Sequence, residues 1–379
     1  MRAPTAPRVF HLLSETEPFS EYKGGAISRW AANVLRDDAD SIIICPSADD
    51  TWRFPHSRVV SCRRFSDYRK YKRAVLKMPW IMRRRLIRTL LSDPIARIGS
   101  GDILWVHNRP DHAFALAPRV HSVGGRIVLH MHNSHLIEQP AEWIVESRID
   151  HFVFVSSYLQ TEAIGCFPFL NNTSVLHNGA DEHMFYPASP ARPPRDVPQI
   201  LFASRLVKEK GVHVFLDAMR LLEQWGIAAK GIIVGASHFG GSRKTAYMAE
   251  IEKRVPTNVE LRPYCSGEIL AALFRESDIF CSPSIWDEPF GMVNVAAFAS
   301  RTPVVSTHGG GSKEVFIDGG GLLVERGSAE KLARALVELI ESPDLREEIA
   351  TAGYRSFKKR YTWAVVQQGY RKILDAVAR

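Results

Sequence analysis

Cysteine is scarce in this chain of 379 residues, and long apolar runs are lacking. Its five cysteines are odd in number and share no close spacing, which argues against a disulfide framework and against a zinc site. No apolar run approaches the roughly 18 residues that a transmembrane helix needs. The first residues mix arginine and proline and lack the apolar core of a secretion signal. We therefore expect a reduced, cytoplasmic protein.

Acidic or basic tails are also lacking, although the formal charge is +8. The basic residues are concentrated between Arg63 and Arg88, a segment that contains eleven lysines and arginines and a single acidic residue, Asp67. Pro79 divides this segment into two predicted helices. Basic residues beside an aromatic suit anionic lipid head groups or an anionic acceptor; a solvated helix face and nucleic acid are the alternatives. We predict membrane or acceptor contacts for these residues: Lys72, Arg73, Lys77, Trp80, Arg83, Arg84 and Arg85.

Short apolar runs alternate with amphipathic stretches along the whole chain, the pattern of an α/β fold. The length suffices for two domains with separate cores. The segment 186–198 is rich in proline and lacks apolar periodicity, so it is predicted to be a linker. We expect domains over 1–185 and 199–360, followed by a last helix over 361–379.

The stretch from Ser282 to Val293 is the strongest candidate for a ligand site. It follows a predicted buried strand, 278–281, and precedes a predicted helix, Val293–Ser300. Loops at the carboxyl ends of parallel strands bind ligands, and the N–H groups that begin a helix suit an anionic phosphate. The stretch carries the carboxylates of Asp287 and Glu288.

Three other loops follow predicted strands in the same way. Gly24 and Gly25 open a helix and allow a phosphate to approach the backbone, although steric demand at a turn explains the glycines equally well. His130 and His132 follow one strand and His107 another; we expect His107 to be structural. Arg205 and Lys210 can bind a diphosphate, whereas a surface ion pair with Glu209 is the alternative.

These motifs together resemble the retaining group 1 (GT4) glycosyltransferases of the GT-B fold. The resemblance rests on Pro283-Ser284 with Glu288-Pro289-Phe290-Gly291, and on motifs at the expected distances before and after them. Those motifs are Lys23-Gly24-Gly25, His130-Met131-His132-Asn133, His177-Asn178-Gly179-Ala180-Asp181, Ser204-Arg205-Leu206 with Glu209-Lys210-Gly211, and Gly309-Gly310-Gly311 with Glu314.

The resemblance implies two Rossmann-like domains that face a central cleft, and it assigns roles to site residues. His132 would orient or hydrogen-bond the donor sugar, Glu288 would lie beside that sugar, and Arg205 and Lys210 would stabilise the departing diphosphate without a metal or other cofactor. No nucleophile is assigned. The residues implied in donor binding are Gly24, Gly25, Arg205, Lys210, Tyr264, Glu288, Phe290, Gly291, Met292 and Val293.

One position departs from the family pattern. The family carries a second glutamate eight residues after the first, credited with binding the nucleotide ribose, and this chain has Ala296 there. A ribose hydrogen bond that is lost without replacement weakens donor binding by roughly 1–3 kcal/mol. Asp287 and Asn294 are the candidates for compensation.

The resulting hypothesis is a hexosyltransferase. It would move a hexose or N-acetylhexosamine from a UDP-sugar, with UDP-N-acetylglucosamine as the specific candidate, to lipopolysaccharide or another surface glycan at the inner face of the cytoplasmic membrane. The pairing of Val106-His107-Asn108 with the 130–133 motif resembles lipopolysaccharide-core N-acetylglucosamine transferases. The alternatives are a non-catalytic glycan-binding or coat protein, which Ala296 favours, and a nucleotide-sugar epimerase.

Overall fold

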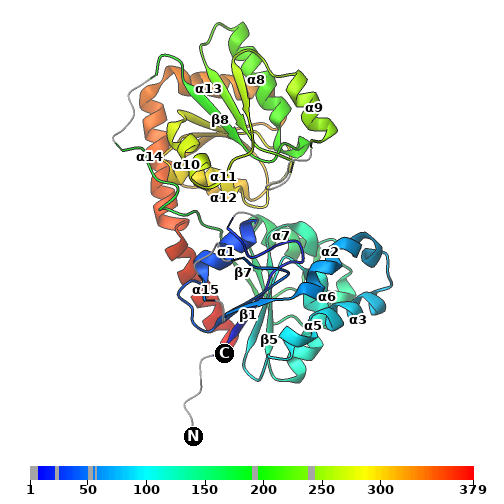
Figure 1. Cartoon of the computed structure of the whole chain (residues 1–379). Coiled ribbons are helices and arrows are strands. Elements are labelled where there is room, and N and C mark those ends of the chain that lie inside the picture. The colour runs from blue at the N-terminus through cyan, green and yellow to red at the C-terminus, as the bar shows by residue number, and fades with distance from the viewer. Residues whose placement is uncertain (1–6, 22–24, 50–53, 56–57, 190–194, 238–243) are drawn as a thin grey trace. The chain divides into compact units, whose positions relative to one another are not determined.

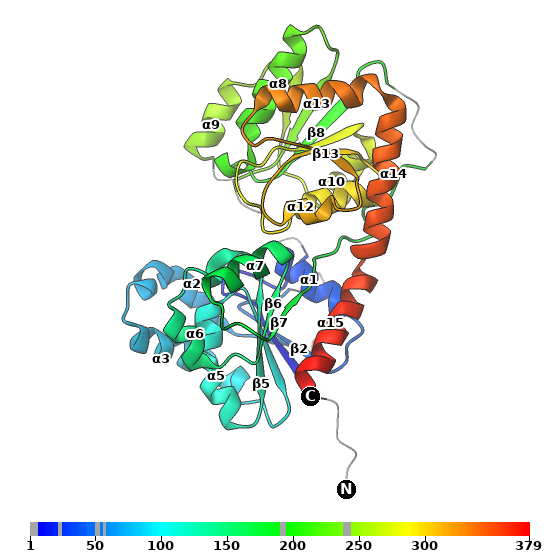
Figure 2. The same cartoon turned by 180° about the vertical axis from the view of Figure 1, so that it is seen from behind.

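The structure is a computed structural model that describes residues 7–21, 25–49, 54–55, 58–189, 195–237 and 244–379. The chain divides into two compact units (Figures 1 and 2). The first comprises residues 1–177 with 366–379, and the second comprises 178–365. The division falls at Asn178, within the turn that follows the strands of the first unit, and again inside the last helix.

The first unit is built on a seven-stranded parallel sheet in the order β3-β2-β1-β4-β5-β6-β7. The strands are β1 (Val9–Leu12), β2 (Ser41–Cys45), β3 (Val59–Ser61), β4 (Ile103–His107), β5 (Arg126–Met131), β6 (His151–Phe154) and β7 (Thr173–Val175). The central strands are almost entirely buried, as expected for a parallel sheet covered on both faces.

Helices cover both faces of this sheet. Figures 1 and 2 show α1 (Ala26–Val34) and α15 (Trp363–Ala378) on one face, with α5 (Pro110–Ser122) and α6 (Ala141–Ser147) on the other. The remaining helices of the unit are α2 (Arg63–Leu76), α3 (Trp80–Leu90), α4 (Ser92–Ile95), η2 (Ser134–Leu136) and α7 (Ser157–Cys166). The predicted break at Pro79 is confirmed, because Pro79 precedes the first residue of α3.

The second unit has a six-stranded parallel sheet in the order β10-β9-β8-β11-β12-β13. Its strands are β8 (Gln199–Ala203), β9 (Lys230–Val234), β10 (Val259–Arg262), β11 (Ile279–Ser282), β12 (Val304–Thr307) and β13 (Gly321–Val324). Its helices are η3 (Lys208–Lys210), α8 (Val212–Gln224), α9 (Ala246–Lys253), α10 (Gly267–Glu276), α11 (Met292–Ala299), α12 (Ser312–Val315), α13 (Ala329–Glu341) and α14 (Pro343–Arg360).

The strand order of the second unit is that of a Rossmann fold, and the first unit repeats it with one additional strand. In the second unit, α8 and α13 pack on the sheet through an apolar core that includes Phe202, Phe215 and Leu336. The two Rossmann-like α/β units confirm the predicted fold class.

Candidate functional site

The loops of the second unit that carry the predicted donor site all leave the same edge of its sheet. The strands are parallel, so the segments after β8, β10, β11 and β12 emerge at their shared carboxyl edge. These segments contain Arg205, Tyr264, the stretch 283–291 and Gly309–Gly311. The edge of a doubly wound sheet at which strand order reverses is the usual place for a ligand; here the reversal lies between β8 and β11.

A hydrogen-bonded carboxylate lies at the centre of this edge. Glu288 is 8% exposed, and its Oε1 accepts from Lys210 Nζ at 2.5 Å and from Ser284 Oγ at 2.6 Å. Burial raises the pKa of Glu288, but the Lys210 charge and the donated hydrogen bonds outweigh burial and hold the pKa below its ordinary value. The carboxylate is therefore ionised at neutral pH and held in one orientation.

Glycine 211 allows the loop that carries Lys210 to approach the loop that carries Ser284. Its φ is +72°, and a Cβ atom there would lie 1.9 Å from the carbonyl oxygen of Pro283. The backbone N–H of Ile285 donates to the carbonyl of Glu209 at 2.9 Å. Sterics therefore explain why glycine follows Lys210: a side chain at position 211 would push the two loops apart.

Arg205 follows β8 and Tyr264 follows β10, so both lie at the same sheet edge as this cluster, on the β8 side of β11. Both are partly exposed, and within the described part of the chain the Arg205 guanidinium has no hydrogen bond or ion pair. The Lys210 ammonium lies 5.3 Å from the ring centre of Trp286. Arg205 and Lys210 thus place two cations at one edge of the sheet, and the N–H donors of the Arg205 guanidinium are available to a ligand. Such a pair can bind a diphosphate.

The helix after the 283–291 stretch begins at Met292, one residue before the predicted start at Val293. Gly291 precedes α11 with φ +92°, and the predicted contact residues Met292 and Val293 form its first turn. The side chain of Phe290 is 2% exposed and packs edge-on against Tyr361, with ring centres 5.8 Å apart. Phe290 therefore anchors the loop to the interior of the second unit. The N–H groups of the first turn of α11 have no intrahelical acceptor.

The position of the missing second glutamate lies on α11. Ala296 is 7% exposed, and Asn294 is 1% exposed with its Oδ1 atom unpaired within the described residues. Asp287 Oδ1 accepts from Gly310 N at 2.8 Å and from Arg326 at 2.6 Å. Asp287 therefore binds the backbone of the glycine loop and Arg326, and the Asn294 side chain is buried. Neither side chain is free to replace the missing glutamate as a ribose ligand. The sequence does not identify Arg326 as the partner of Asp287, because the two residues are far apart along the chain and no motif links them.

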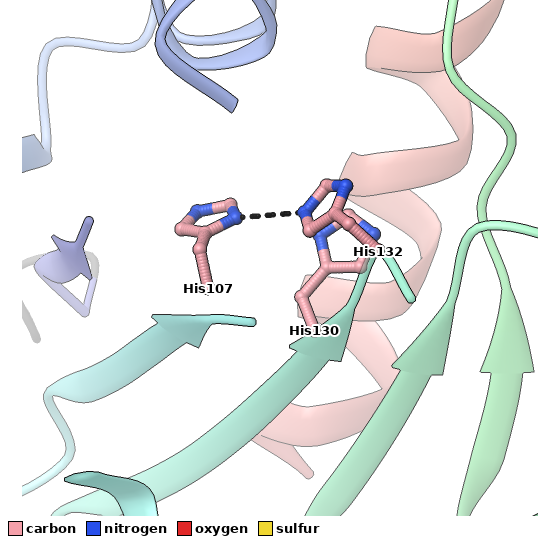
Figure 3. A group of neighbouring side chains, drawn as sticks. All are labelled: His107, His130 and His132. Atoms are coloured by element: carbon pink, nitrogen blue, oxygen red, sulfur yellow. Dashed lines mark hydrogen bonds between the residues drawn. The ribbon is translucent and has the colours of Figure 1, made fainter. Parts of the chain in front are cut away.

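In the first unit, the predicted histidines meet at the carboxyl ends of β4 and β5. His107 Nδ1 and His132 Nε2 are 3.2 Å apart, and the ring centres of His130 and His132 are 4.1 Å apart (Figure 3). One ring nitrogen from each of the three histidines lies within 4.8 Å of the others, a set that could hold a metal ion. Burial lowers the pKa of His132 to about 3, and it lowers the pKa values of His107 and His130 well below their ordinary range. All three rings are neutral at physiological pH.

The N-terminus of α1, predicted to bind phosphate, is capped by a carboxylate of the chain itself. Glu17 Oε1 accepts from Ser28 N at 3.0 Å, and a Cβ on Gly25 would lie 2.8 Å from the same oxygen. Gly24 lies outside the described residues. Burial raises the pKa of the Glu17 carboxyl, and the backbone hydrogen bonds that it accepts oppose that shift. The carboxyl group already occupies this helix N-terminus, so a phosphate would have to replace it.

The basic segment forms α2 and α3. The side chains of Lys72 and Arg73 lie outside the described part of the chain, whereas Lys77 and Arg85 are exposed and Arg84 is partly exposed. The Arg83 side chain is buried, with its guanidinium carbon 5.0 Å from the centre of Trp80 and 5.3 Å from that of Trp143. Trp80 in turn stacks on Trp143. Arg83 and Trp80 therefore hold α3 in place.

None of the helices in the described residues combines the length and the apolar character needed to cross a bilayer.

Known proteins match this chain in its second unit and in its fold. Residues 189–356 match the family model "Glycosyl transferases group 1". An uncharacterised glycosyltransferase of Methanocaldococcus jannaschii is 27% identical over 60% of this chain and 60% of its own length. The spore coat protein SA of Bacillus subtilis is 22% identical over 72% of this chain and 78% of its own length. The chain spans less than two thirds of the length of the M. jannaschii relative.

A solved structure agrees over nearly the whole chain. The Anabaena protein HepE, crystallised with UDP and glucose, aligns with a TM-score of 0.74 at 18% identity, covering 98% of this chain and 100% of that one. At that identity the likeness shows the fold, which is GT-B. The match to the group 1 glycosyltransferase model is confined to residues 189–356, whereas the agreement in fold extends over nearly the whole chain.

Proposed function

We propose that this chain transfers a sugar from a nucleotide sugar to an acceptor, with retention of configuration and without a metal or other cofactor. The observation that carries the proposal is the hydrogen-bonded cluster of Lys210, Ser284 and Glu288, at the sheet edge that also carries Arg205 and within the segment that matches the family model. Glu288 and the first turn of α11 would bind the donor sugar and its phosphates. Arg205 and Lys210 would neutralise the charge that develops on the departing diphosphate.

The donor is proposed to be a UDP-sugar, with UDP-N-acetylglucosamine as the specific candidate. The UDP bound by the Anabaena protein makes UDP-sugars the first to test. A thermal-shift panel of UDP- and GDP-sugars, with and without chelator, measures binding directly. A shift by one donor that chelator leaves unaltered supports the proposal, and loss of that shift in Arg205→Ala identifies the site. No shift from any donor would contradict it.

Retention is proposed to follow from attack on the same face from which the diphosphate leaves. The anionic Glu288 is already paired with Lys210 and Ser284, which suits a carboxylate that orients sugar hydroxyls. Proton NMR of the product gives the anomeric configuration. An inverted product would contradict this mechanism.

The acceptor is proposed to be a lipopolysaccharide or another surface glycan at the inner face of the cytoplasmic membrane. The α2–α3 surface supports this: its apolar side chains Tyr71, Leu76, Met78, Ile81 and Met82 are 36–81% exposed, and Lys77, Arg84 and Arg85 lie among them in sequence. Apolar groups interleaved with cations suit an anionic bilayer surface.

Vesicle sedimentation tests this surface. Ile81, 81% exposed, and Ile317, 68% exposed in the second unit, form a matched pair. Ile81→Asp is expected to release the protein from vesicles of anionic lipid, because it places a charge in the apolar layer, whereas Ile317→Asp should bind as the parent does. Equal binding by both variants would contradict membrane association through α2 and α3.

A non-catalytic role is the second candidate, favoured by Ala296 and by the similarity to a spore coat protein. Slow hydrolysis of a nucleotide sugar in the absence of acceptor separates the two, because a binding protein releases no UDP. An epimerase would instead convert the donor to another nucleotide sugar, which chromatography of the same reaction detects.

A further inference from the structure

His132 is the last member of a chain of hydrogen bonds in the first unit that is buried at its centre and partly buried at its two ends. His132 Nε2 lies 3.2 Å from His107 Nδ1, and His107 Nε2 lies 3.2 Å from His11 Nδ1. His11 Nε2 lies 2.9 Å from the Tyr370 hydroxyl, which lies 3.5 Å from Asp38 Oδ2. His11, His107 and Tyr370 are at most 1% exposed. Residues 11 and 370, far apart in sequence, thus meet between β1 and α15.

We propose that Tyr370, His11 and His107 are positioning residues that hold His132 in one neutral tautomer. Each contact between two imidazoles needs one proton, and each neutral ring supplies one. The protons can therefore all point away from Asp38 or all point toward it. The first arrangement leaves a proton on His132 Nδ1, and the second leaves a lone pair there.

The Asp38 end of the chain selects the second arrangement. The Ser41 hydroxyl donates to Asp38 Oδ2 at 2.7 Å, which leaves the Ser41 oxygen as an acceptor 3.4 Å from both His11 Nε2 and the Tyr370 hydroxyl. A carboxylate attracts the donor ends of hydrogen-bond dipoles, most strongly where water is excluded. His11 therefore donates to Tyr370, His107 to His11, and His132 to His107.

The relay fixes a tautomer and does not store a charge. Burial lowers the pKa of His11 to about 3 and that of His132 to about 3, so an added proton is expelled at neutral pH. His132 is left with an Nδ1 lone pair that has no hydrogen-bond partner within the described residues; because this atom is buried, a sugar hydroxyl can donate to it only after the groups that cover it move. That last statement rests on the proposed function, whereas the tautomer does not.

A metal ion on the three histidines is the competing reading of the same cluster. It would have to take the place of the proton between His107 and His132, and the ligand set contains no carboxylate to offset its charge. The His130 ring, whose nitrogens have no hydrogen-bond partner in the described part of the chain, lies nearly perpendicular to Trp30 and Trp105. Its surroundings are those of an aromatic core residue.

Nitrogen NMR of the full chain labelled with ¹⁵N-histidine tests the relay, because protonated and bare ring nitrogens resonate far apart. A His132→Gln sample assigns the His132 signals. The parent should show one His132 tautomer, with the proton on Nε2. Tyr370→Phe keeps the ring that packs on Trp30 and Trp105 but removes the hydroxyl, so His132 should become a mixture of two tautomers. Tyr361→Phe, at another buried tyrosine, should leave it unchanged.

Turnover of the nucleotide sugar gives the second readout. Tyr370→Phe should lower kcat by about fivefold, the size of one hydrogen bond, and Tyr361→Phe should not change it. An unchanged tautomer in Tyr370→Phe would overturn the relay. A shifted tautomer with unchanged kcat would overturn the positioning role. One equivalent of metal in the purified protein, lost in His130→Phe, would also overturn the relay. Absence of turnover in the parent would count against the proposed function alone, since the tautomer still decides the relay.

Discussion

Glu288 keeps its negative charge in a place that disfavours it. Burial alone raises the pKa of this carboxyl, and the Lys210 ammonium with the Ser284 hydroxyl reverses the shift. A group balanced in this way depends on its partners, because removing one partner of a buried pair leaves the other charge unpaired.

Lys210→Ala is therefore expected to lower the free energy of unfolding by about 3 kcal/mol, measured by urea denaturation. The double variant Lys210→Ala with Glu288→Gln should recover part of that loss, since it buries no unpaired charge. Lys208→Ala, at an exposed position two residues away, is the control and should change little. A Lys210→Ala protein as stable as the control would contradict the pairing.

The sequence identifies some residues of this site and misses the partners that hold them. Lys210, Glu288 and Arg205 belong to motifs whose order along the chain is informative. The contacts from Arg326 to Asp287 and from Glu17 to the start of α1 depend on where separate segments meet. Such contacts cannot be predicted from sequence periodicity, because it is the folded sheet that brings these segments together.

At the scale of the element, glycine decides how closely two loops approach. Gly211 and Gly226 both have positive φ, +72° and +74°. Alanine at either position should cost about 1 kcal/mol from the left-handed backbone. At Gly226 no atom lies within 4 Å of the added Cβ, whereas at Gly211 the Pro283 carbonyl lies at 1.9 Å.

Gly211→Ala is therefore expected to lose clearly more stability than Gly226→Ala in urea denaturation, and to weaken donor binding because the 283–288 loop must move. The two variants share the backbone strain, so their difference isolates the close approach. Equal losses would show that the loop adapts at no cost.

The N-terminus of α1 supplies a second prediction for an element. Glu17→Ala removes the carboxylate that accepts from Ser28 N, and the loss of such a cap costs about 1 kcal/mol. The midpoint of thermal unfolding should fall, whereas Glu341→Ala, at the exposed end of α13, should not lower it. If Glu17 occupies a phosphate position, Glu17→Ala should also bind the donor more tightly; unchanged donor affinity would remove α1 from the donor site.

Most elements could be predicted, and those missed share a physical reason. The predicted strand 278–281 and the predicted helix Val293–Ser300 correspond to β11 and α11, each displaced by one residue. The strands expected before the loops that carry His107, His130 and Arg205 are β4, β5 and β8. The strand β3 was missed and β7 was indicated only in part, because each has three residues and is partly exposed, so neither has an apolar run. The strand β13 contains the apolar residues Leu322 to Val324, but it begins at a glycine, has four residues and is only partly buried.

For the whole molecule, both units use the Rossmann strand order, but they differ in what they bury. The second unit buries an ion pair at its strand ends, whereas the first buries His11, His107 and His130 and places the partly buried His132 beside them. Their folded-state pKa values lie far below the ordinary value of about 6.5. The unfolded chain therefore binds more protons than the folded one at mildly acidic pH.

The first unit is accordingly expected to be sensitive to acid. For groups with depressed pKa values, stability is fully present above the unfolded pKa and is lost as pH falls below it. The loss approaches about 1.4 kcal/mol per pH unit for each histidine. Hydrogen exchange of the β4 and β5 amides between pH 8 and pH 4.5 should show protection that declines from about pH 6.5 downward.

The variant His130→Phe tests the origin of that decline. His130 has no ring hydrogen bond to lose within the described residues, so its replacement removes one proton-binding group and leaves the relay intact. The slope of stability against pH should become shallower, because one histidine fewer takes up a proton on unfolding, while His11, His107, His132 and His151 keep lowered pKa values. His135→Phe, at a histidine whose side chain is 44% exposed, should leave the slope unchanged. An unaltered slope in His130→Phe would mean that other groups cause the acid sensitivity, since a buried neutral histidine must take up a proton when the unit unfolds.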